Sequence, residues 1–213
     1  PSLAEELMIA RDIKLVEYTK GRLNFSCIST AKSVELIRVA KKQGLNITAD
    51  VAIHNLVLDE TACEGFDTRY KLNPALRTQK DITALIKGLK DNTIDAISSD
   101  HTPEDIENKK VEFDNAEFGM ISLQTAFSLA CKLENEIGLE GIIEKMAVNP
   151  RKLLGINVPD INTDKAANLC LFNPKNEWTL EEKNIVSKSK NTPFIGKTLK
   201  GKIIGVINNG KLY

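Results

Sequence analysis

The stretch LNFSCISTAKSVELIRVAKKQGLNITADVAI, residues 23–53, decides the fold class. Its two ends, residues 23–28 and 46–53, are apolar runs of strand length. Between them apolar residues repeat at helical spacing, and this helix pattern begins after the cap residue Thr30 and stops at Gly44. A strand, a helix and a second strand in this order form the unit of α/β folds with a parallel sheet.

The alternation continues on both sides of this stretch. A helix pattern over residues 3–18 precedes it, and a helical stripe over 82–89, a strand over 94–99 and a helix over 120–133 follow it. Strands that alternate with helices in one sheet run parallel and are joined by right-handed crossovers. Both a (β/α) barrel and an open doubly wound sheet fit this order.

The pattern changes towards the C-terminus. Short β-type runs over residues 168–172 and 202–208 are separated by Pro, Asn and Gly. We therefore divide the chain into an α/β part, residues 1–156, and a β segment, residues 157–213.

Composition excludes several classes of protein. The 213 residues include 29 basic and 29 acidic side chains, and this zero net charge argues against nucleic-acid binding. No apolar run approaches the roughly 20 residues of a membrane helix. The first residue is Pro1, so we expect a further segment before it. Four cysteines without a Cys-x-x-Cys pair predict reduced thiols in the cytoplasm; they are Cys27, Cys63, Cys131 and Cys170.

The loops that follow strands are the place to look for chemistry, because function gathers at the carboxyl ends of parallel strands. Directly after the third strand stand Asp100 and His101. A carboxylate fixed there can bind a metal and accept a proton from its water, and His101 could orient or shield it. A turn or helix-cap aspartate is the structural alternative for Asp100. We interpret His54, after the second strand, as a surface or turn histidine.

Several segments spread over nearly the whole chain carry a family resemblance. They are LAEELMIARD (3–12), IST (28–30), KLNPALR (71–77), ISSDHTP (97–103), FGMISLQT (118–125), VNP (148–150) and NTPFIGKTLKG (191–201). In order and spacing they resemble the long-chain bacterial dihydroorotases, within the metal-dependent amidohydrolase superfamily. Two of them, residues 71–77 and 191–201, are more similar to dihydroorotases than to the related allantoinases and hydantoinases.

The resemblance implies a specific architecture. The three strands would be strands six, seven and eight of a (β/α)8 TIM-type barrel whose first half lies outside this chain. Residues 1–156 would then be a partial amidohydrolase-like barrel. Residues 157–213 would be the C-terminal β segment of a small composite domain.

The resemblance also implies site residues. Asp100 matches a residue that binds metal and acts as general base, and Asn73 matches one that hydrogen-bonds the pyrimidine ring. His101 and the backbone at Gly119 would meet the substrate. The family cofactor is zinc. Since most family ligands would lie outside this chain, we expect the chain alone not to bind it.

Two departures from the family pattern bear on activity. Cys27 stands where the family has a histidine zinc ligand, and a thiolate would weaken the power of the metal to acidify water. Glu104 stands where a histidine faces the substrate, and its charge should repel the carboxylate of dihydroorotate.

Two functions follow from the resemblance. The first is hydrolysis of dihydroorotate to N-carbamoyl-L-aspartate in pyrimidine biosynthesis, impaired or absent in this fragment. The alternative is a non-catalytic homologue that serves as a scaffold for aspartate transcarbamoylase; Cys27 and Glu104 favour it. An allantoinase or hydantoinase ranks below both. A second copy of the chain is a further expected partner, because an unpaired edge strand needs cover.

Overall fold

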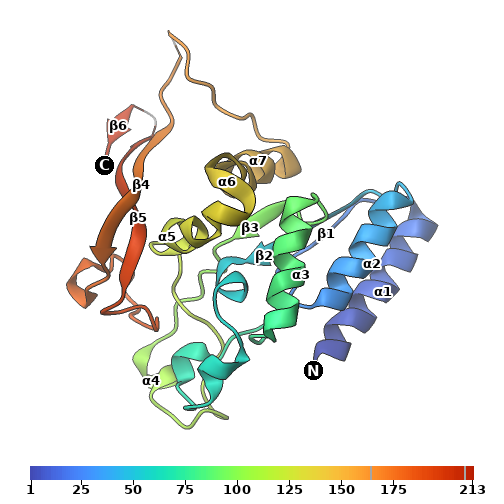
Figure 1. The fold of residues 1–213 in the computed structure, drawn as a ribbon, viewed down its shortest axis with the longest axis horizontal. Coiled ribbons are helices and arrows are strands. Elements are labelled where there is room, and N and C mark those ends of the chain that lie inside the picture. Colours follow the sequence, from blue (N-terminus) through green and yellow to red (C-terminus); the bar gives the residue numbers. More distant parts are fainter. Residues whose placement is uncertain (164, 209) are drawn as a thin grey trace.

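The computed structural model describes residues 1–163, 165–208 and 210–213 (Figure 1). Its first sheet has three parallel strands in the order β1 (Leu23–Phe25), β2 (Ile47–Ala52) and β3 (Ala96–Ser98). The parallel sheet predicted from the alternation of strands and helices is therefore confirmed.

Seven α-helices lie in the described residues, and the second and third of them connect the strands of this sheet. They are α1 Ser2–Thr19, α2 Ala31–Lys42, α3 Gln79–Lys90, α4 Ile106–Lys109, α5 Ala126–Ala130, α6 Glu134–Ile143 and α7 Asn149–Leu154. The first three lie side by side, α1 against α2 and α2 against α3 (Figure 1). The predicted cap of α2 is present, since the Thr30 hydroxyl accepts the Ser33 N–H.

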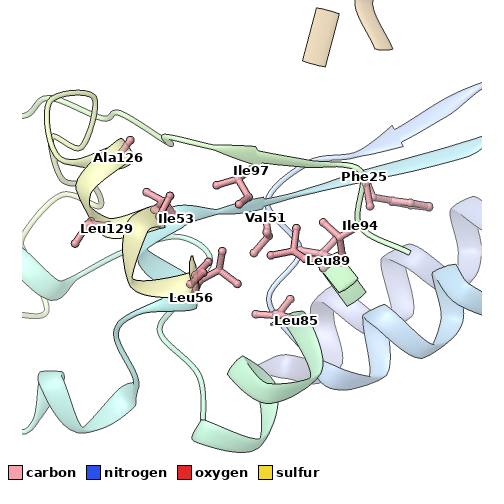
Figure 2. Packing of buried hydrophobic residues seen from close by; sticks show 14 of the residues in the cluster. Phe25, Val51, Ile53, Leu56, Leu85, Leu89, Ile94, Ile97, Ala126 and Leu129 are labelled. Carbon is pink, nitrogen blue, oxygen red and sulfur yellow. The ribbon is translucent and has the colours of Figure 1, made fainter. Parts of the chain in front are cut away.

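The core lies between the sheet and the helices (Figure 2). The cluster includes Val51 of β2 and Ile97 of β3 together with Leu85 of α3 and Leu129 of α5. All four are buried. Because the central strand β2 is covered, the turn that follows it begins inside the protein.

Two predicted boundaries were wrong. The first strand was expected to reach residue 28, but β1 ends at Phe25, because Cys27 adopts a left-handed φ of 53° and its N–H donates to a side chain of β2. The helix expected from Met120 begins at Ala126. Met120 instead forms a bridge beside His101, and the Ile121 N–H donates to a carbonyl from the C-terminal part.

The C-terminal part forms an antiparallel sheet of β4 (Leu169–Thr179), β5 (Thr198–Asn208) and β6 (Lys211–Leu212). Its first two strands are longer than the sequence predicted. Trp178 joins this sheet to α5, because its indole N–H lies 3.0 Å from both the Ser128 hydroxyl and the Gly201 carbonyl oxygen.

Within the described residues, no helix combines the length and the apolar character needed to cross a membrane.

Candidate functional site

The carboxyl ends of the three parallel strands bring together residues that are far apart in the sequence. Cys27 follows β1, His54 follows β2 and Asp100 follows β3. The Cys27 sulfur lies 3.5 Å from the Ser98 hydroxyl, and His54 Nε2 lies 3.4 Å from Asp100 Oδ2. The candidate site is therefore this polar cluster at the end of the sheet.

Asp50 is a member of the cluster that sequence reasoning missed. It is a nearly buried residue of β2, and its Oδ1 accepts the Cys27 N–H at 3.0 Å, while its Oδ2 accepts the Asn24 side-chain amide at 2.9 Å. These bonds fix the left-handed turn at Cys27. A carboxylate inside an otherwise apolar strand was the available signal.

The Cys27 thiol is held in its neutral form. Burial raises its pKa, and the negative charges of Asp100 and Asp50 raise it further. Because the thiolate is the metal-binding form of cysteine, a metal at this position would have to displace the thiol proton.

Asp100 is half-buried and has a left-handed φ of 46°. Burial raises the pKa of its carboxyl, and the negative charge of Asp50 raises it further. A carboxyl group whose pKa moves up towards neutrality is better suited to accept and return a proton.

His54 corrects the sequence interpretation. It lies in a turn, Ile53–Leu56, but it is fully buried instead of lying at the surface, because this turn packs against α3 and α5. Burial lowers its pKa to about 4, so the imidazole is neutral at neutral pH. Although Asp100 is close, burial dominates, and the two do not form an ion pair at neutral pH.

His101 organises the chain segment opposite β3. Its Nδ1 accepts the backbone N–H of Ser122 at 3.0 Å and that of Leu123 at 3.3 Å. Nε2 is therefore the ring nitrogen that can bind another partner. The predicted substrate contact of His101 would have to be made by this atom.

The loops that carry Asn73 and Gly119 lie next to each other. The Gly119 N–H donates to the Lys71 carbonyl oxygen at 2.9 Å. Gly119 has φ 133°, and a Cβ there would lie 2.5 Å from the Thr102 side chain, so only glycine fits. Asn73 is exposed. The Gly119 carbonyl oxygen accepts the Asn191 side-chain amide at 3.1 Å, so the predicted substrate contact would have to use the second lone pair of this oxygen.

Two further residues shape these loops. Glu104 is half-buried, and its carboxylate accepts the side-chain amide of Asn108 at 3.2 Å. Asn191 is buried, and its side-chain amide donates at 3.1 Å to the carbonyl oxygens of Thr102 and Gly119. The sequence offered no signal for this role beyond the segment 191–201.

The donor set does not fit a metal centre by itself. Across the residues that the structure describes, no three His, Cys, Asp or Glu side chains come together as metal ligands would. A zinc ion of the family type would need ligands from outside this chain.

Comparisons with known proteins place the geometry in context. Residues 2–213 match the Amidohydrolase family. A dihydroorotase of Ruminiclostridium cellulolyticum is 46% identical over 94% of the chain and 48% of its own length. A dihydroorotase of Acetivibrio thermocellus is 43% identical over 100% of the chain and 50% of its own length. The chain thus spans about half the length of these relatives.

Solved structures show the same fold at low sequence identity. The L-hydantoinase (dihydropyrimidinase) of Arthrobacter aurescens has a TM-score of 0.91 and 23% identity, covering 100% of this chain and 49% of its own. The inactive dihydroorotase-like domain of the CAD-like multifunctional protein of Chaetomium thermophilum has a TM-score of 0.72 and 21% identity, covering 94% of this chain and 53% of its own.

Proposed function

The chain belongs to the amidohydrolase family, and from this premise we propose that it is the C-terminal half of a dihydroorotase. The reaction would be the opening of the cyclic amide of dihydroorotate by water to give N-carbamoyl-L-aspartate. The observation that carries the proposal is 43% identity over 100% of the chain to a protein named dihydroorotase.

The proposed architecture is the second half of a (β/α)8 barrel. In it β1, β2 and β3 are barrel strands six, seven and eight, and residues 1–156 form the barrel portion. Their parallel sequential order and the helix after each strand support this. Residues 157–213 then supply the C-terminal β segment of a small second domain.

In the proposed reaction Asp100 moves the proton. Water adds to the ring carbonyl carbon and gives a proton to the Asp100 carboxylate. The carbon–nitrogen bond then breaks, and Asp100 returns the proton to the departing ring nitrogen, so atoms and charges balance. The raised pKa of Asp100 supports this role.

Substrate orientation would come from the adjacent loops. The exposed Asn73 amide would hydrogen-bond the pyrimidine ring, and His101 Nε2 and the Gly119 carbonyl oxygen would face its polar edge. The neutral Cys27 and the carboxylate of Glu104 predict weak activity. Zinc, if used, would depend on ligands outside this chain.

The proposed partners follow from the same chemistry. The proposed substrate is a small molecule. The predicted protein partners are a second copy of the chain and aspartate transcarbamoylase. All four cysteines are free, which suits the predicted cytoplasmic location.

The test is hydrolysis of dihydroorotate by the purified chain assembled with the N-terminal half of the Ruminiclostridium cellulolyticum dihydroorotase. We expect turnover that Asp100→Asn abolishes and that Asp105→Asn, an exposed aspartate in the same loop, leaves unchanged. Hydantoin and allantoin are the comparison substrates. Preference for either would replace dihydroorotase by another cyclic amidase, and an assembled but inactive protein would favour the scaffold hypothesis.

A further inference from the structure

His54 is the buried polar side chain whose presence the fold does not explain. It is fully buried, yet neither ring nitrogen has a hydrogen-bond partner among the described residues. An unpaired polar group in the interior costs about 1–3 kcal/mol. A core position that needed only volume would be filled better by leucine, so the imidazole calls for a polar explanation.

The carboxylate of Asp100 is also unpaired within the described residues. Its carboxylate receives no hydrogen bond from any residue that the structure describes, although it is half-buried and strained in its backbone. The polar groups around it do not supply a strong donor. Asp50 is itself an acceptor, and the Cys27 thiol is only a weak donor.

The unpaired imidazole and the unpaired carboxylate lie close together. His54 Nε2 lies 3.4 Å from Asp100 Oδ2, just beyond a good hydrogen-bond length. A neutral imidazole has one N–H, so the contact is attractive only in the tautomer with the proton on Nε2. A small rotation of either side chain then closes the bond.

We propose that His54 is a positioning residue: its Nε2–H holds Oδ2 of Asp100 and leaves Oδ1 free to accept the proton. This rests on the proposed function of Asp100. A carboxylate on a left-handed turn has several rotamers, and a donor on one oxygen selects one of them and so fixes where the other oxygen lies. Hydrogen bonds of this kind commonly orient reactive groups in enzymes.

The first test measures the His54 tautomer by long-range proton–nitrogen correlation NMR on the ¹⁵N-labelled chain. His101 is an internal reference, because its Nδ1 accepts two backbone N–H groups and its proton must lie on Nε2 when neutral. The chain has two histidines, so both ring systems can be assigned. We expect the same tautomer for His54; a proton on Nδ1 would overturn the proposal.

The second test uses a matched pair of variants in the assembled protein. Glutamine places its amide near the Nε2 position and asparagine near Nδ1. His54→Gln should therefore keep kcat for dihydroorotate within about threefold, and His54→Asn should lower it about 10- to 100-fold with little change in KM. Equal losses in both variants would contradict a positioning role.

The two proposals can fail separately. The tautomer is measured without turnover, so an inactive protein with an Nε2 proton on His54 would disprove the dihydroorotase proposal and keep the contact. An active protein with the His54 proton on Nδ1 would support the dihydroorotase proposal and disprove the contact between His54 and Asp100.

Discussion

At the residue scale, the buried His54 makes the stability of the chain depend on pH. Its pKa is about 4 in the folded chain, below its unfolded value of about 6.5. Between these two pH values the unfolded state binds more protons than the folded state. The contribution of neutral His54 to the free energy of unfolding is therefore complete above pH 6.5 and is lost as the pH falls towards 4. The loss should reach about 3 kcal/mol.

Urea unfolding between pH 7 and pH 4 checks this prediction, with His54→Leu as the comparison. The variant lacks the titrating group and should lose about that much of the pH dependence. An unchanged slope in the variant would show that other groups are responsible.

Asn191 is a second residue whose importance lies in its contacts. Its side chain bonds carbonyl oxygens of two separate loops from a buried position. Asn191→Ala leaves those carbonyls unpaired and should lower the free energy of unfolding by about 2–4 kcal/mol. The control is the exposed Asn162, whose side chain bonds the exposed Asp160; its replacement by alanine should change stability by less than about 0.5 kcal/mol.

At the element scale, the start of α2 depends on a side chain from α1. The Glu5 carboxylate accepts the N–H of Ser29 at 2.8 Å and of Thr30 at 3.2 Å, and it lies 3.6 Å from the Arg77 guanidinium. Backbone N–H groups at a helix start favour a negative charge. One carboxylate therefore ties together α1, α2 and the segment that follows Asn73.

Glu5→Ala should therefore destabilise the chain by about 2–3 kcal/mol, since it leaves backbone N–H groups unpaired and removes the carboxylate that faces Arg77. Glu6→Ala, one residue along the same helix, is the control, because the Glu6 side chain makes no hydrogen bond to any residue that the structure describes. Thermal unfolding of both variants measures the difference, and equal shifts would show that the contact contributes little.

The elements also show how far periodicity can be trusted. The helices α2 and α3 and the central strand agree with their patterns, because each buries a face whose spacing is visible in the sequence. Helix α1 has the predicted extent, but it buries Ile9, Ile13 and Val16 and leaves its leucines exposed. The segment 120–125 looked helical, yet its backbone binds His101 and Asn191 instead. Those partners are distant in sequence, and local spacing carries no information about them.

At the scale of the whole molecule, α1 presents an apolar outer face. Leu7 is 61% exposed and Tyr18 is 88% exposed, with Leu3 and Leu15 on the same helix also exposed. Exposed apolar faces of this kind mark interaction sites. In the proposed barrel this face packs on the preceding half.

The double substitution Leu7→Glu with Leu15→Lys should therefore reduce assembly with the co-expressed N-terminal half at least about 10-fold, without lowering the unfolding temperature of the chain. Val186→Lys alters a residue of the C-terminal part that is 88% exposed, and it should leave assembly unchanged. Size-exclusion chromatography of the co-purified halves measures both. Unaltered assembly of the double variant would place the contact elsewhere.

The sequence by itself determined the α/β class, the parallel sheet and the placing of Asp100 directly after a strand, because these depend on local periodicity and on short motifs. Only the tertiary structure decided that Asp50 fixes Cys27 and that His54 is buried against Asp100. It also decided that Asn191 joins two loops. The physical reason is that hydrogen bonding and desolvation act between neighbours in space, and those neighbours are chosen by how the elements pack.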